Sequence, residues 1–237
     1  MLLFLCSPCV RKTMTPTVSF YSSSIGQKMI SAITGLFLCA FLVVHISGNL
    51  LLFKNDGGLA FNEYAVSNAS SLLMRSLEIV LFAGFLIHLY WGIRIWLFDR
   101  RARTRGYAVY HPSENSSLSS RMMILSGSTV LFFLIVHLRS FWVPMRFAGG
   151  PEVSLFLTVR TAFQNPVYDV FYLACLVLLG YHLHQGFQSA LQTFGVRPFW
   201  RKAIEGIAVV FWLIIPIGFA SMPVYFYFSK GAMGRWS

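Results

Sequence analysis

Five long runs of apolar residues, separated by polar connections, dominate the pattern of this chain. They cover residues 29–53, 77–98, 122–143, 167–191 and 204–228. Each run reaches the roughly 20 residues that an α-helix needs to cross a bilayer. The pattern therefore predicts an all-α integral membrane protein with five transmembrane helices in a bundle. Residues 21–237 are interpreted as a single transmembrane domain, and residues 1–20 as an N-terminal tail of unknown role.

Turn-forming residues mark the ends of several of these runs. Asn165 and Pro166 are expected to open the fourth helix, and Gly195 and Pro198 to close it. The connection 144–165 is long enough to include a short interfacial helix.

Composition and charge support a membrane location. The chain is 56% hydrophobic and 11% charged, whereas a soluble domain carries about 25% charged residues. The formal net charge of +11 comes from Lys and Arg beside the apolar runs, the pattern of topology determinants, so nucleic acid is not expected as a partner. The densest basic cluster, 100–105, lies between the second and third runs. The positive-inside rule then places the N-terminus in the cytoplasm.

Histidines are distributed unusually along the chain. Five of the six lie inside the apolar runs, and only His111 is in a connection. The five are His45, His88, His137, His182 and His184. Ionisable residues inside a membrane are costly and mark functional sites. A histidine in each of four consecutive helices is hard to explain by ordinary helix packing alone.

Depth in the membrane sorts four of these histidines into two pairs. His45 and His137 lie 16 and 15 residues after the cytoplasmic start of their runs, which at ~1.5 Å per residue is roughly 24 Å across. His88 and His182 lie 10 and 9 residues before the cytoplasmic end of theirs, roughly 15 Å from that side. The sequence therefore predicts an outer pair and an inner pair.

Two histidines at one depth on different helices can bind one iron from both sides. Such bis-imidazole ligation leaves no open position, so the pattern favours two b haems that carry electrons. Gly84 and Gly92 flank His88 at four residues, and Gly186 follows His182 at four. Glycine there would leave room for a macrocycle, or simply for close helix packing.

Metal transport and proton-coupled transport fit the pattern less well, because no acidic residue lies deep in a run. Of the four cysteines, Cys39 and Cys175 are interpreted as apolar core residues, and the pair Cys6 and Cys9 is weak evidence for a metal. The chain contains no C-x-x-C-H sequence, which excludes covalent haem attachment of the c type.

Several segments resemble a known family. Residues 24–28 (SIGQK), 35–37 (GLF), 44–49 (VHISGN) and 54–64 are similar to the opening of the cytochrome b membrane-anchor subunit of succinate dehydrogenases and fumarate reductases, in the single-subunit, five-helix, dihaem class. Residues 180–187 (GYHLHQGF) and 189–193 (SALQT) are similar to the fourth helix of that family. The resemblance covers about residues 22–228 and is most specific in helices one and four.

The resemblance implies that His45 and His137 carry the outer haem and that His88 and His182 carry the inner haem. It also implies a flavoprotein subunit and an iron–sulfur subunit on the cytoplasmic face of a prokaryotic inner (plasma) membrane. The chain would be the membrane subunit of an enzyme complex. It would pass electrons to or from a quinone, usually menaquinone, and would perform no dicarboxylate chemistry itself.

Further site residues follow from position. Candidates for contact with haem propionates are Lys28, Ser31, Arg94 and Arg139. Candidates for a quinone site are Glu63, Glu78 and His184. Some dihaem fumarate reductases carry Glu two residues before the fourth-helix histidine; Gly180 stands there in this chain, so that proton path is not carried over.

A dihaem cytochrome b of a hydrogenase or formate dehydrogenase, and a transporter or scaffold without haem, stay open as alternatives.

Overall fold

The computed structural model describes residues 20–102, 118–147 and 154–229. Helices and no strands are found in these ranges, and five of the helical segments are long and apolar enough to cross a membrane. The predicted tail, with Cys6 and Cys9, lies almost wholly outside the described residues, as does His111. The prediction of an all-α fold with five possible spans is confirmed, and the chain has the architecture of a multi-pass membrane protein.

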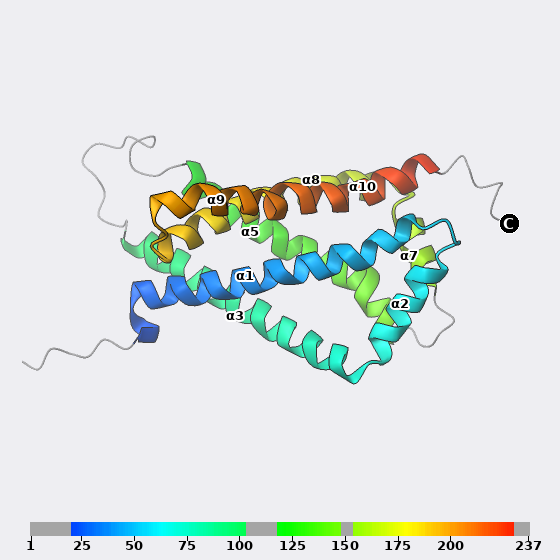
Figure 1. The fold of residues 1–237 in the computed structure, drawn as a ribbon, viewed down its shortest axis with the longest axis horizontal. Coiled ribbons are helices and arrows are strands. Elements are labelled where there is room, and N and C mark those ends of the chain that lie inside the picture. The colour runs from blue at the N-terminus through cyan, green and yellow to red at the C-terminus, as the bar shows by residue number, and fades with distance from the viewer. Residues whose placement is uncertain (1–19, 103–117, 148–153, 230–237) are drawn as a thin grey trace, which may run out of the picture.

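The five spans run side by side along the long axis of the molecule (Figure 1). The first is α1 (Ser24–Asn49), extended by a 3₁₀ turn (Leu50–Phe53), and the second is α3 (Leu72–Ala102). The third consists of α5 (Leu118–His137), a π-helical turn (Leu138–Trp142) and α6 (Val143–Phe147). The fourth is α8 (Pro166–Thr193). The fifth consists of α9 (Pro198–Val209), a π-helical turn (Val210–Ile214) and α10 (Ile215–Phe228).

Polar residues cap the starts of the first and fourth spans. Ser23 accepts a hydrogen bond from the amide of Gly26 at 3.0 Å and starts α1. Asn165 accepts from the amides of Val167 and Tyr168, with Pro166 in the first turn, as predicted for the start of the fourth helix. Gly195 has φ +63° just after α8, a conformation that favours glycine.

Two short helices connect the spans at the end of the bundle opposite the start of α1 (Figure 1). One is α7 (Leu155–Ala162), which confirms a short helix within 144–165. The other, α2 (Leu59–Ser70), was not predicted, because its sequence has little amphipathic pattern. Phe61 of α2 and Phe156 of α7 are buried in one cluster with Leu52 and Phe226, which ties these helices to the spans.

The fourth span is the centre of the bundle. It packs against α1, α5 and α10, whereas α3 packs mainly on α1. A third (33%) of the most apolar stretch of α8 is buried inside the protein, against none of the corresponding stretch of α3. Exposed apolar side chains on the other spans suit contact with lipid. Residues on α8 therefore have more of their neighbours within the protein than residues on α3 do.

Gly180 on α8 lies against the backbone of the fifth span, and this contact gives a first prediction. A Cβ atom there would stand 2.7 Å from the carbonyl oxygen of Trp212. We expect Gly180→Ala to lower the free energy of unfolding by about 1–3 kcal/mol, because backbone must shift to admit the methyl group. Denaturant titration in mixed micelles measures the change.

The matched control is Gly206→Ala. No atom of the described residues lies within 4 Å of a Cβ at Gly206, and alanine favours a helix over glycine by about 1 kcal/mol. This variant should be as stable as the original chain or slightly more stable. Equal stability of the two variants would show that α8 and the fifth span do not pack rigidly at Gly180.

Candidate functional site

The outer pair of histidines comes together between the first and third spans. His45 lies on α1 and His137 is the last residue of α5; their ring centroids are 5.7 Å apart and their planes are nearly perpendicular, at 87°. Two imidazoles that bind one metal from opposite sides through bonds of ~2 Å have centroids roughly 6 Å apart. Phe41 stacks on His45 at 5.3 Å, and Phe219 of α10 lies at 5.3 Å from the same ring. The pair is therefore enclosed by aromatic rings and has the separation of two ligands to one metal.

Each histidine of the inner pair packs against a glycine on a neighbouring helix. His88 of α3 faces α1, where a Cβ at Gly35 would stand 3.0 Å from the imidazole. His182 of α8 faces α5, where a Cβ at Gly127 would stand 3.4 Å from the ring. Glycine at these positions lets each neighbouring helix approach a histidine ring closely.

The two pairs occupy two levels of the bundle. His45 comes ten residues after Gly35 on α1, and His137 comes ten residues after Gly127 on α5. At ~1.5 Å of rise per residue, each interval corresponds to roughly 15 Å along the axis. Both helices give the same spacing, so His45 and His137 lie at one level of the bundle, and the glycines that contact His88 and His182 lie at another.

Hydrogen bonds fix the protonation of the inner histidines. Nδ1 of His88 lies 3.0 Å from the backbone oxygen of Ser31, which can only accept, so Nδ1 carries the proton. Nδ1 of His182 lies 3.4 Å from Oγ of Ser126, and this hydroxyl donates to the oxygen of Met123 at 3.1 Å. Oγ is therefore the acceptor for His182 as well. In both rings Nε2 keeps a lone pair that can bind a metal.

The outer histidines are held differently. Nδ1 of His137 lies 2.8 Å from the hydroxyl of Tyr172, which can donate or accept. The side-chain nitrogen of Asn49 donates to the backbone oxygen of His45 at 2.8 Å and lies 3.4 Å from Nδ1 of the same residue. An amide nitrogen only donates, so Nδ1 of His45 is the acceptor here and Nε2 carries the proton. Binding of a metal through Nε2 would require that proton to move.

Haem fits this donor set better than a bare metal ion. No group of three or more His, Cys, Asp or Glu side chains within the described ranges could hold a metal ion, but haem iron needs only two protein ligands. Gly92 and Gly186, beside the inner histidines, have no atom of the described residues within 4 Å of a Cβ position. Gly84 differs, because Phe37 occupies the space beside it, so ordinary helix packing accounts for that glycine.

The four candidates for propionate contact are not brought together. Lys28 and Arg94 are exposed, and Arg94 donates to the hydroxyl of Tyr90 at 3.0 Å and lies over the ring of Trp91. Ser31 reaches the inner pair through its backbone oxygen. Arg139 is exposed just beyond His137, where it lines a shallow hollow with Phe147. Of the four, Ser31 is the one that contacts a histidine.

The quinone-site candidates also lie apart. Glu63 is exposed on α2. Glu78 forms an ion pair with Arg146 and accepts from the indole nitrogen of Trp142, which joins the second and third spans. His184 meets the ring of Trp212 at 5.0 Å, on the side of the fifth span. His182 and His184 thus face different helices, because residues two apart point to opposite sides of an α-helix.

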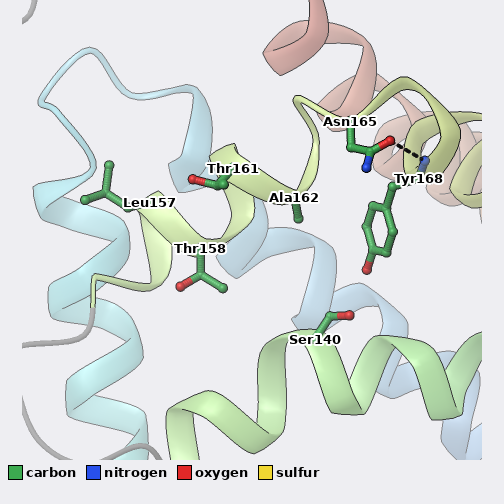
Figure 2. Close-up of a pocket in the computed structure, with 7 residues that line it drawn as sticks. All are labelled: Ser140, Leu157, Thr158, Thr161, Ala162, Asn165 and Tyr168. Carbon is green, nitrogen blue, oxygen red and sulfur yellow. Dashed lines mark hydrogen bonds between the residues drawn. The ribbon is translucent and has the colours of Figure 1, made fainter.

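A hollow of about 560 Å³ lies near the outer pair, between the third span, α7 and the start of α8. Figure 2 shows its lining, with the ring of Tyr168 directed towards Ser140. The remaining lining residues are Leu157, Thr158, Thr161, Ala162 and Asn165. Tyr168 packs against Tyr172 with ring centroids 4.9 Å apart. Two aromatic rings therefore separate this hollow from His137.

Sequence reasoning found the histidines but missed the groups that hold them. The sequence feature that could have pointed to these groups is a polar residue inside an apolar run, as at Thr34, Ser126 and Tyr172. The hydroxyl of Thr34 lies 3.3 Å from Nδ1 of His88.

Comparison of the chain with protein-family models, with curated proteins and with solved structures finds no match.

The ion pair of Glu78 gives a second prediction. The side chain of Arg146 is 9% exposed and that of Glu78 is 21% exposed, and Arg146 also donates to the backbone oxygen of Ala69 at 3.3 Å. We expect Glu78→Gln to lower the free energy of unfolding by about 2 kcal/mol, less than for a fully buried pair, because Arg146 loses its counter-charge. The same mixed-micelle titration measures the effect.

The control is Glu205→Gln, which removes the carboxylate of the exposed pair with Arg201. Solvent screens that pair, so little change is expected. If the two variants lost the same amount of stability, the link between the second and third spans would not depend on Glu78.

Proposed function

We propose that this chain is the dihaem cytochrome b membrane anchor of a succinate:quinone oxidoreductase. The observation that carries the proposal is the ring contact between His45 and His137, with His88 and His182 held at a second level roughly 15 Å away along the bundle. Nδ1 of His88, His182 and His137 lies within hydrogen-bond distance of an oxygen that can accept a hydrogen bond from it. Such bonds orient metal-binding histidines and leave Nε2 for the metal.

In this proposal His45 and His137 hold the outer haem, and His88 and His182 the inner one. When bound, haem with two histidine ligands supplies reversible one-electron chemistry. The protein holds each ring in place and surrounds the outer pair with Phe41, Phe219 and other apolar side chains that exclude water. With no open ligand position, the site transfers electrons and does not bind oxygen.

The partners in this proposal are a flavoprotein subunit and an iron–sulfur subunit on the cytoplasmic face, with membrane menaquinone as the electron acceptor or donor. The dense basic cluster at 100–105 supports a cytoplasmic location for that end of the bundle. The sequence resemblance to the anchor subunits supports the identity of the partners. Dicarboxylate chemistry belongs to the flavoprotein, and the complex lies in a prokaryotic plasma membrane.

Haem content gives the third prediction. A pyridine haemochrome assay on the purified chain should find about two b haems per polypeptide. His88→Ala and His182→Ala should each remove the same haem, and His45→Ala and His137→Ala should each remove the other, since one missing ligand frees one iron. Reduced-minus-oxidised spectra identify which haem is left.

A folded, haem-free chain would overturn the proposal in favour of a transporter or scaffold. Retention of both haems in any of these four variants would overturn its ligand assignment. If the chain held two haems but co-purified with the subunits of a hydrogenase or formate dehydrogenase, it would be the cytochrome b of that complex instead.

His184 gives the fourth prediction. Its ring faces Trp212 on the fifth span, whereas the neighbouring His182 faces α5. We expect His184→Ala to keep both haems with unchanged spectra, and the haemochrome assay beside His182→Ala tests this. Loss of one haem from His184→Ala, with both kept in His182→Ala, would exchange the roles of the two neighbours.

A further inference from the structure

Tyr172 is a tightly enclosed polar residue beside the outer pair. It lies on α8 and is 5% exposed. Its ring makes edge-on contacts with Phe133 at 4.8 Å, Phe163 at 5.1 Å and Phe141 at 6.2 Å. Rings on several sides hold the phenol in one orientation, so the position of its hydroxyl is set by the bundle.

This hydroxyl makes the shortest of the contacts to Nδ1 atoms in the two pairs. It lies 2.8 Å from Nδ1 of His137, against 3.0 Å for the backbone oxygen at His88 and 3.4 Å for the hydroxyl at His182. When His137 binds a metal through Nε2, its proton resides on Nδ1. The imidazole then donates to the oxygen of Tyr172, and an acceptor at Nδ1 makes a histidine ligand more basic.

We propose that Tyr172 is a positioning residue that orients His137 and lowers the reduction potential of the outer haem. A more basic ligand gives more electron density to the iron and favours its oxidised form. This inference rests on the proposed function, because it requires haem on His137. It goes further by assigning control of one haem potential to a residue that does not bind iron.

Ser126 provides the counterpart at the other level. It is 0% exposed, and its Oγ faces His182. The two hydroxyls belong to different pairs and lie at levels roughly 15 Å apart. Removing each hydroxyl should therefore affect a different haem, which separates a local hydrogen-bond effect from a general change in the protein.

The test is an optical redox titration of the purified full-length chain with the subunits that accompany it. Tyr172→Phe keeps the ring and removes the hydroxyl. The expected result is two retained haems, an upward shift in the midpoint potential of one, and no change in the other. Ser126→Ala should raise the potential of the other haem. Tyr225→Phe removes a phenol hydroxyl from a half-exposed ring packed on Phe53 and should change neither.

Three results would overturn the inference. The first is Tyr172→Phe with both potentials unchanged. The second is a shift in the same haem that Ser126→Ala affects. The third is loss of either haem from Tyr172→Phe, because the hydroxyl would then be needed for binding and not for tuning. Absence of haem from the original chain is a different outcome, which removes the proposed function itself.

Discussion

The structure depends on the cost of placing imidazoles inside an apolar bundle. A buried ring nitrogen without a partner is unfavourable by several kcal/mol in a medium that offers no water. The bundle meets this constraint with a carbonyl at His88, a hydroxyl at His182 and a phenol at His137. These partners come from α1, α5 and α8, so the position of each histidine is set by how two helices pack against each other.

Close packing of α1 on α3, and of α5 and the fifth span on α8, makes these contacts possible. Gly35 and Gly127 let their helices approach the inner rings, and Gly180 admits the backbone of the fifth span. The third and fifth spans each contain a π-helical turn, a feature often found at functional sites. One begins directly after His137. The other contains Trp212, which meets both His184 and Gly180. The two spans that contain a π-helical turn therefore both pack against the fourth span.

Hydrophobic pattern alone predicts the five spans, because lipid requires long uninterrupted apolar helices. Depth along those helices predicts the two pairs, because the rise per residue is constant. The hydrogen-bond partners of the imidazoles cannot be predicted in this way. Tyr172 and Ser126 contact the histidines only because neighbouring helices have a particular rotation about their axes, which the hydrophobic pattern does not define. The sequence left Gly84 open between contact with a cofactor and ordinary helix packing, and the structure shows that it packs on Phe37. Helix α2 has little amphipathic pattern, and its tertiary contacts through Phe61 are not visible in the sequence.

The equal ten-residue intervals on α1 and α5 restrict how this protein can vary in length. One residue inserted or deleted in a helix turns everything beyond it by about 100°. Such a change between Gly35 and His45 would leave the contact with His88 in place and rotate His45 away from His137. The stretch 54–58, where two glycines have positive φ, can absorb an added residue without this rotation. Related chains should therefore differ in length between their helices, and hardly ever between the two histidine levels.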